Sequence, residues 1–195
     1  MSQELIYEFS NDPNLLAPYY RIREECYKEV WGLKIFSGAE DEFDRRGHIL
    51  IVRNGNEVVG GGRLVLRPAF SSDRLPMETE SFLLHKVLPL AEKEKAIFGE
   101  IGRIALIPEY RGKKTAKIGF YLVLQAQLHH CRYLTTVAPK GQAEKYRDIA
   151  GQFGVEIQIF EDVAIADHPY YNNIDMKLLL CDLTNIPDVS HFLVI

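Results

Sequence analysis

The hydrophobic period changes along the chain, and these changes predict an order of strands and helices. Short apolar runs that end at Gly, Pro or Asn predict strands, and apolar residues at steps of three and four predict helices. The predicted strands are Leu5–Phe9, His48–Arg53, Glu57–Leu66, Ile97–Ile107, Tyr133–Ala138, Val155–Phe160 and Met176–Leu183. The predicted helices are Tyr19–Trp31, Thr115–His130 and Gln142–Gln152, with short helices in Met77–Glu94 and irregular chain in Gly32–Gly47, Arg67–Leu75 and Asp162–Asn173.

The dipeptide Asn54-Gly55 between two apolar runs is the clearest local signal. Both residues tolerate the positive φ that a tight hairpin turn requires. Gly60-Gly61-Gly62 in the next strand predicts a bulge or the close approach of another element. A hairpin implies antiparallel strands, whereas strand–helix alternation in the second half implies parallel neighbours. We therefore predict an α/β fold with a mixed central sheet and helices on both faces, in one domain over residues 1–195.

The composition narrows the class of protein. The chain has 195 residues, of which 47% are apolar and 26% charged, which is typical of a folded soluble domain. Its net charge of −4 argues against nucleic-acid binding through bulk charge. The three cysteines are far apart in sequence, so neither a disulfide framework nor a structural zinc site is expected. Without a recognisable signal peptide or an apolar run of about 20 residues, we expect a cytoplasmic protein with no stable membrane insertion.

Residues 99–116 carry the strongest chemical signal. A buried strand ends at Pro108, a basic turn follows at 111–114, and a helix opens at Thr115. The first turn of a helix offers unpaired backbone N–H groups and the positive end of the helix dipole, which together attract an anion. The phosphate of a phosphopantetheine group suits such a site. A solvated basic turn at a helix start is an equally good interpretation.

The residues Arg111, Gly112 and Ala116 fit the pattern R-G-x-G-x-G/A, with Lys114 in place of the second glycine. This pattern resembles the acyl-coenzyme A signature of the GNAT acyltransferase superfamily, whose mixed sheet is splayed between its fourth and fifth strands. The resemblance implies acyl-CoA, or the acyl-phosphopantetheine of an acyl carrier protein (acyl-ACP), as co-substrate. The residues that would bind it are Ile104, Ala105, Leu106, Arg111, Gly112, Lys113, Lys114, Thr115 and Ala116.

A second set of spaced residues narrows the resemblance. It consists of Arg23, Tyr27 and Trp31, then Asp41-Glu42-Phe43-Asp44, Gly62-Arg63-Leu64 and Glu100-Ile101-Gly102-Arg103. This set is similar to the acyl-homoserine-lactone synthases and the related N-acyl amino acid synthases. The resemblance implies transfer of an acyl chain to the amine of an amino acid or related small molecule, as in autoinducer synthesis for quorum sensing. Acyl carrier protein is then a candidate partner.

The reaction would be attack of an amine on a thioester carbonyl, and the amine must lose a proton. Glu100, flanked by apolar residues, is the best candidate for the base, because burial raises the pKa of a carboxyl group toward a useful range. A structural pair with Arg103 is the alternative. On a regular strand these two side chains point to opposite faces, unless a bulge at Gly99 or Gly102 intervenes.

Other roles follow from the same chemistry. Backbone N–H groups of Ile104–Leu106 would hold the thioester oxyanion. Tyr146 would protonate the leaving thiolate, with packing against the sheet as the alternative. The residues that would receive the acceptor by resemblance are Trp31, Asp41, Asp44, Arg63 and Arg103. A structural salt-bridge network, and a core position for Trp31, are the alternatives.

His129-His130-Cys131 has no further ligand at a useful spacing, so we expect no metal site. Two other functions compete with acyl-chain transfer. One is a short-chain acetyltransferase that uses acetyl-CoA. The other is a non-catalytic module that binds an acyl thioester or a lipid, since a fold does not decide a function.

Overall fold

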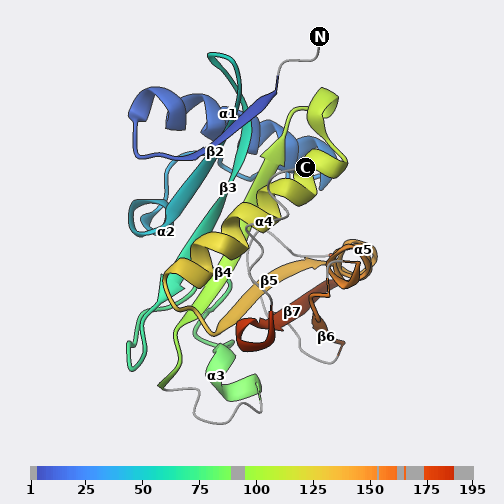
Figure 1. The fold of residues 1–195 in the computed structure, drawn as a ribbon. Coiled ribbons are helices and arrows are strands. Elements are labelled where there is room, and N and C mark those ends of the chain that lie inside the picture. Colours follow the sequence, from blue (N-terminus) through green and yellow to red (C-terminus); the bar gives the residue numbers. More distant parts are fainter. Residues whose placement is uncertain (1–3, 89–94, 153, 162–164, 166–173, 187–195) are drawn as a thin grey trace.

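A computed structural model of the protein describes residues 4–88, 95–152, 154–161, 165 and 174–186. Within these residues seven strands form one mixed sheet in the order β1-β2-β3-β4-β5-β7-β6 (Figure 1). The strands are β1 (Leu5–Phe9), β2 (His48–Asn54), β3 (Glu57–Arg67), β4 (Phe98–Leu106), β5 (Tyr133–Pro139), β6 (Gln158–Phe160) and β7 (Met176–Asp182). Strands β4 and β5 are parallel and the other neighbours are antiparallel. The predicted mixed α/β sheet is confirmed.

The helices are α1 (Pro13–Val30), α2 (Glu42–Arg46), α3 (Leu84–Val87), α4 (Lys113–Leu128) and α5 (Lys140–Gly151), with 3-10 turns at Pro108–Tyr110 and Leu183–Asn185. Glycines in β3 let α1 and α4 pack closely on opposite faces of the sheet. A Cβ on Gly61 would lie 2.9 Å from the Tyr19 ring of α1, and a Cβ on Gly62 would lie 3.0 Å from Ile118 of α4. Because successive strand residues face opposite sides, helices cover both faces, as predicted.

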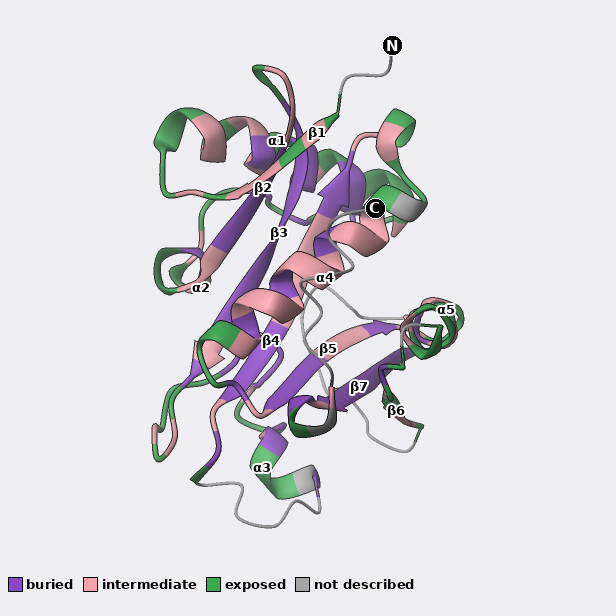
Figure 2. Ribbon diagram, in the orientation of Figure 1, coloured by how far each residue is buried: buried purple, intermediate pink, exposed green. Residues whose placement is uncertain are grey.

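The centre of the sheet is buried on both sides. From Val58 to Val65 of β3 every residue is buried, and Figure 2 shows buried positions concentrated along β2, β3 and β4. Leu50 and Leu64 pack with Ile118 and Leu122 of α4, while Tyr19 of α1 packs on the opposite face. This core holds β4 firmly against β3, so any opening in the sheet falls on the other side of β4.

Several predicted boundaries shift, and one helix was not predicted. Helix α2 lies inside the segment expected to be irregular, where Asp41 and Asp44 form a capping box around a single turn. Helix α1 begins at Pro13, well before the predicted Tyr19, with Asp12 as its N-cap. Strand β6 is shorter than expected. The short helix predicted within Met77–Glu94 is α3, and residues 89–94 of that segment lie outside the described residues, as does Asp162–Asn173 except for residue 165.

Two observations concern ions and membranes. No helix in the described part of the chain is both long and apolar enough to cross a membrane. Among the same residues, no three His, Cys, Asp or Glu side chains come together as metal ligands would.

Candidate active site

The sheet opens between β4 and β5. The two strands pair over three rungs only, the last of which joins Glu100 to Thr135. Thr135 Oγ1 donates a hydrogen bond to the Gly99 carbonyl at 3.0 Å and closes the sheet at that point. Beyond it β4 continues to Leu106 alongside β3, while β5 continues to Pro139 alongside β7. Figure 1 shows the two strands diverging from this vertex.

A β-bulge in β4 contributes to the divergence. Between the pairs Gly61–Ala105 and Arg63–Gly102, two residues of β4 oppose one residue of β3. Arg103, one of these two residues, adopts a positive φ of 57°. A bulge bends its strand and increases the local twist, which turns the end of β4 away from β5. The sequence left open a bulge at Gly99 or Gly102, and the structure has one directly after Gly102.

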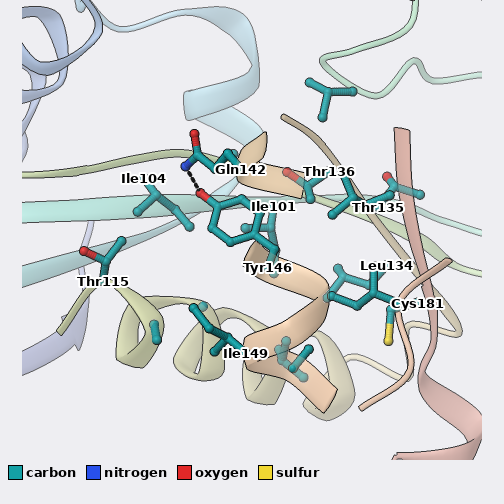
Figure 3. A pocket seen from close by; sticks show the side chains of 18 of the residues that line it. Ile101, Ile104, Thr115, Leu134, Thr135, Thr136, Gln142, Tyr146, Ile149 and Cys181 are labelled. Carbon is teal, nitrogen blue, oxygen red and sulfur yellow. Dashed lines mark hydrogen bonds between the residues drawn. The ribbon is translucent and has the colours of Figure 1, made fainter. Parts of the chain in front are cut away.

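A cavity of about 270 Å³ occupies the opening. Its lining comes from β4, α4, β5, α5 and β7, with Tyr27 and Trp31 of α1 and its C-cap. Figure 3 shows the cavity extending from Ile104 and Thr115 at one end of the view to Leu134 and Cys181 at the other, with the Tyr146 ring between them. Most of these side chains are apolar, so the cavity suits a hydrocarbon chain better than a charged ligand.

Four of the predicted donor-binding residues, Ile104, Gly112, Thr115 and Ala116, line this cavity, whereas Ala105 and Leu106 do not, and Ala105 is buried in the cluster beneath α1. Gly112 is the N-cap of α4 with a φ of 92°, a backbone conformation that glycine adopts readily. Gly112, Thr115 and Ala116 line the cavity. The α4 N-terminus therefore faces the opening, with its helix dipole directed there.

Side chains in the basic turn at 111–114 make contacts with other protein groups. The Arg111 guanidinium donates to the Leu106 carbonyl at 2.9 Å through Nε, and its Nη2 lies 3.4 Å from Cys26 Sγ. The Lys114 ammonium lies 4.6 Å from the centroid of the Tyr110 ring. The side chain of Lys113, another predicted donor contact, lies outside the described atoms.

Backbone groups at the end of β4 face the opening. Ile107 donates its N–H to the Val59 carbonyl of β3 at 3.0 Å. In an extended strand the peptide groups of successive residues point to opposite sides, so those of Leu106 point away from β3. The Leu106 carbonyl does so, since it accepts hydrogen bonds from Arg111 and Cys26. The Leu106 N–H is thereby directed to the edge of β4 that β5 has left.

Glu100 lies at the vertex and is almost fully buried. Its Oε2 accepts a hydrogen bond from the Met77 backbone N–H at 2.8 Å. Burial raises the pKa of Glu100 to about 7; the Met77 bond and the charges of Arg63 and Arg103 lower it in part, and Glu78 raises it. A carboxyl group with a pKa near 7 is half ionised at neutral pH and can take up a proton there.

A second, smaller cavity of about 30 Å³ adjoins Glu100. It is lined by Tyr27, Trp31, Arg63, Pro76, Met77, Glu100, Ile101, Gly102, Arg103, Thr136 and Val137. We call it the acceptor pocket. It shares Trp31, Arg103 and Thr136 with the larger cavity, which we call the donor cavity. The two therefore meet at the opening in the sheet, beside Glu100.

The charged residues predicted as a cluster do lie together. Arg63 Nη1 lies 2.8 Å from both Asp41 Oδ1 and Asp44 Oδ1, and Arg103 Nη2 lies 3.7 Å from Asp41 Oδ2. Arg23, named only as part of the sequence pattern, completes the cluster through a two-point contact with Asp44 at 2.9 Å. The guanidinium of Arg23 also donates to the carbonyls of Gly38 and Ala39.

Members of the cluster differ in exposure. The side chains of Arg63 and Asp44 are 2% and 0% exposed, whereas those of Asp41 and Arg103 are 32% and 12% exposed. Burial alone would raise the pKa of Asp44, but Arg23 and Arg63 hold that pKa below its usual value. Asp44 also accepts from the Asp41 N–H, so protein groups occupy its oxygens. Asp41 and Arg103 are the more accessible members.

Tyr146 of α5 projects into the donor cavity (Figure 3). Its hydroxyl accepts a hydrogen bond from Gln142 Nε2, one helical turn earlier. Burial, and to a smaller extent Tyr27, raises the pKa of Tyr146 to about 12, while Gln142 lowers it in part. The phenol therefore keeps its proton at neutral pH. Gln142 was not predicted, although its spacing of four residues from Tyr146 placed both on one helix face.

Trp31 lines both cavities and stacks near Tyr27, with ring centroids 5.0 Å apart. Arg103 lies over Phe36, its guanidinium carbon 4.7 Å from the ring centroid. The Met77 amide and its neighbours Arg67 and Glu78 were not predicted as part of the site. Their spacing from Glu100 in the sequence follows no helix or strand period, because it is the loop after β3 that brings Met77 to the Glu100 carboxyl group.

The family model of the acetyltransferase (GNAT) domain matches residues 22–119, about half of the chain. The chain belongs to the GNAT family and is an acyl-transferring enzyme. No curated protein sequence matches it.

Solved structures share the fold over almost the whole chain. FeeM, an N-acyl amino acid synthase from uncultured soil microbes, is 18% identical with a TM-score of 0.63, and covers 96% of this chain and 92% of its own. LasI, an acyl-homoserine lactone synthase, is 14% identical with a TM-score of 0.64, and covers 96% and 94%. MesI, a CoA-dependent acyl-homoserine lactone synthase, is 22% identical with a TM-score of 0.61, and covers 98% and 96%. At these identities the likeness establishes the GNAT-like fold.

Proposed function

We propose that the protein is an N-acyltransferase that moves an acyl chain from a phosphopantetheine thioester to the amine of an amino acid or related small molecule. One observation supports this most strongly: an apolar cavity of about 270 Å³ and a small polar pocket meet beside a buried carboxyl group. The pantetheine arm would take part of that volume. The apolar lining continues beyond it to Leu134 and Cys181, which favours an acyl chain longer than acetyl.

The donor would enter from the α4 side. Its phosphate would lie against the first turn of α4, at Gly112–Ala116, with Arg111, Lys113 and Lys114 beside it. The pantetheine arm would occupy the gap between β4 and β5, and the thioester would lie near Ile104–Leu106. Acyl-CoA and acyl-ACP carry the same phosphopantetheine, and both belong to the cytoplasm.

The acceptor would enter the pocket beside Glu100. Its carboxylate would pair with Arg103, and Trp31 would contact its remaining groups. Arg63 lines the pocket as well, but Arg63 and Asp44 would mainly hold this side of the pocket in shape, because each is enclosed by protein partners. Asp41 does not line the pocket and would act on the acceptor through its contact with Arg103.

The chemistry follows from these positions. Glu100 takes a proton from the ammonium group, directly or through a water molecule, and the free amine attacks the thioester carbonyl carbon. A C–N bond forms, and the negative charge on the carbonyl oxygen is stabilised by the Leu106 N–H, since the Ala105 N–H points toward β3. The C–S bond then breaks, and Tyr146 donates its proton to the departing thiolate. The new amide nitrogen loses its second proton, which returns Tyr146 to its neutral form, and the proton held by Glu100 is released to solvent. The products are an amide and a free thiol.

A single-turnover assay tests the proposal. Acetyl, octanoyl and dodecanoyl thioesters of CoA and of carrier protein are mixed with a panel of amino acids and amines, and free thiol is measured. We expect amine-dependent release that is faster for the longer chains. Glu100→Gln should slow it by about 10²- to 10⁴-fold, whereas Glu57→Gln on the exposed hairpin should leave it unchanged.

The other outcomes identify other functions. Transfer confined to acetyl-CoA would identify a short-chain acetyltransferase. Tight thioester binding without transfer, unaffected by Glu100→Gln, would identify a binding module. Equal and amine-independent thiol release from every donor would contradict transfer to an amine.

A further inference from the structure

A buried ion pair lies behind Glu100, in the segment that joins β3 to α3. Arg67, the last residue of β3, contacts both carboxylate oxygens of Glu78 through Nη1, at 2.9 and 3.0 Å. Both side chains are enclosed, at 9% and 0% exposure. The Arg67 guanidinium also lies over the Phe98 ring, 4.8 Å from its centroid, at the start of β4. The pair thus joins the loop to the two strands that carry the site.

The Glu78 carboxylate also closes the loop on itself. Oε2 accepts from the Leu75 N–H and Oε1 from the Leu84 N–H, both at 2.8 Å. With Arg67 these bonds fill its hydrogen-bonding positions with protein donors. Leu75 and Leu84 are fully buried in the core cluster beneath the sheet. The loop residues between Leu75 and Leu84 are therefore held in a fixed position relative to this core.

Met77 lies inside this closed segment. It is 1% exposed, and its N–H makes the hydrogen bond to Glu100 Oε2. Pro76 and Met77 also form part of the wall of the acceptor pocket. A change in the loop would move the amide that orients the carboxyl group, and the wall against which the acceptor lies.

We propose that Arg67 and Glu78 are positioning residues for acyl transfer: together they hold the Met77 amide on Glu100 and the 76–77 wall against the acceptor. This inference rests on the proposed function. Neither residue lines either cavity, so both act through Met77 and Pro76. With Nη1 shared between the two carboxylate oxygens and the guanidinium plane held over Phe98, the pair fixes the position of the Glu78 carboxylate as well as its charge.

Removing Arg67 has a defined electrostatic consequence. The charged groups that face Glu100 are Arg63 from β3, Arg103 from β4 and Glu78 from the loop. Arg67→Met leaves the Glu78 charge without its guanidinium partner and loosens the Met77 amide. Both changes disfavour the ionised form of Glu100. The base should therefore ionise at higher pH.

The test compares Arg67→Met with the wild-type protein and with Arg53→Met, which removes an ion pair with Glu8 on the opposite side of the sheet. Two quantities are measured: the acid limb of kcat/KM for the acceptor, and the titration of the ¹³C-labelled Glu100 carboxyl by NMR. We expect both midpoints to rise by about one pH unit in Arg67→Met, which is about a tenfold loss of kcat/KM below the midpoint. Arg53→Met should leave both unchanged.

If Arg67→Met does not fold, Arg67→Lys decides, because it keeps the positive charge and loses the guanidinium plane that lies over Phe98 and sets the position of Nη1. A higher midpoint with at least a twofold lower kcat at pH 6 supports the inference. Unchanged midpoints in the folded variants, with lower stability alone, overturn it and leave a structural role. If no acceptor supports transfer by the wild type, the proposed function fails, while the NMR midpoint still tests whether the ion pair controls Glu100.

Discussion

At the scale of single residues, Glu100 combines two properties that usually oppose each other. It is buried at the centre of the molecule, and it is placed to take up a proton. Burial raises the pKa of Glu100 to about 7, and one backbone hydrogen bond together with two arginines limits the rise. Burying a carboxyl group in this way destabilises the folded state. The same burial raises its pKa into the range that the proposed role as a base requires.

This weakening predicts how stability depends on pH. The pKa of Glu100 is higher in the folded protein than its ordinary value of 4.5, so folding becomes less favourable as pH rises from about 4.5 to about 7. The loss is complete above about pH 7 and corresponds to about 3 kcal/mol. Glu100→Gln keeps an acceptor for Met77 and carries no charge. We expect it to be more stable than the wild type by about 2 to 3 kcal/mol at pH 8 and nearly equal to it at pH 4.5.

Urea unfolding of the two proteins at both pH values measures this difference. Because only the difference between them is used, titration of the other groups cancels to first order. A stability difference that is the same at pH 4.5 and pH 8 would contradict a raised pKa at Glu100.

At the scale of elements, helix α2 fixes the charged cluster. Asp41 and Asp44 cap one turn of helix, and the same two carboxylates contact Arg63 of β3. Arg23 of α1 closes the cluster from the other side. Three elements far apart in the sequence are thereby joined through side chains, next to the acceptor pocket.

Two substitutions separate stability from activity within this cluster. Asp44→Asn leaves Arg23 and Arg63 buried with less than their full countercharge, so we expect a loss of about 3 to 5 kcal/mol in the free energy of unfolding. Asp41→Asn keeps a good N-cap residue on a partly exposed side chain, so we expect a loss of about 1 kcal/mol or less.

The variant that loses less stability should lose more of its acceptor binding. Asp41→Asn should raise KM for the acceptor, whereas folded Asp44→Asn should bind the acceptor nearly as the wild type does. Urea denaturation and steady-state kinetics on both variants check this. Equal stability losses in the two would show that the exposed and the buried carboxylate are equivalent.

At the scale of the whole molecule, the opening in the sheet lies between the two cavities that we propose for the donor and the acceptor. The donor cavity lies between α4, α5 and β7, and the acceptor pocket lies against α1 and the loop at 76–77. Two substrates can therefore approach the same point from two faces.

Substitutions at different depths along the donor cavity should have different effects on the acyl donors. A Cβ on Gly119 of α4 would meet no other atom within 4 Å, and Gly119 lines the cavity, so a larger side chain there would extend into it. Gly119→Leu should weaken binding of every thioester, and it should not reduce stability because leucine favours a helix by about 1 kcal/mol over glycine. Cys181→Phe, near the vertex, should reduce transfer of dodecanoyl more than of acetyl groups.

Acyl-length profiles of kcat/KM for the two variants provide the measurement. Thermal unfolding of each serves as the control for packing, since a larger residue at Cys181 can strain the core by about 1 to 3 kcal/mol. A uniform loss over all chain lengths in Cys181→Phe would place the acyl chain elsewhere.

Much of this organisation could be predicted from local sequence. The Asn54-Gly55 dipeptide predicted the β2–β3 hairpin, but the turn lies one residue later than expected: Asn54 ends β2, the turn residues are Gly55 and Asn56, and of these only Gly55 has a positive φ. The apolar runs around Glu100 and the period of residues 115–130 predicted β4 and α4. The capping pair of α2 was overlooked, since a single turn of helix has no hydrophobic period to reveal it.

The sequence by itself determined which elements form and which residues carry charge or a titratable group, because turn chemistry and hydrophobic period act over a few neighbouring residues. Only the tertiary structure decided where β4 and β5 separate and that Met77 reaches Glu100. It also decided that Arg23 pairs with Asp44, and that a cavity rather than a core fills the gap. These outcomes depend on packing between segments distant in the chain, and on the burial that such packing imposes on a carboxyl group.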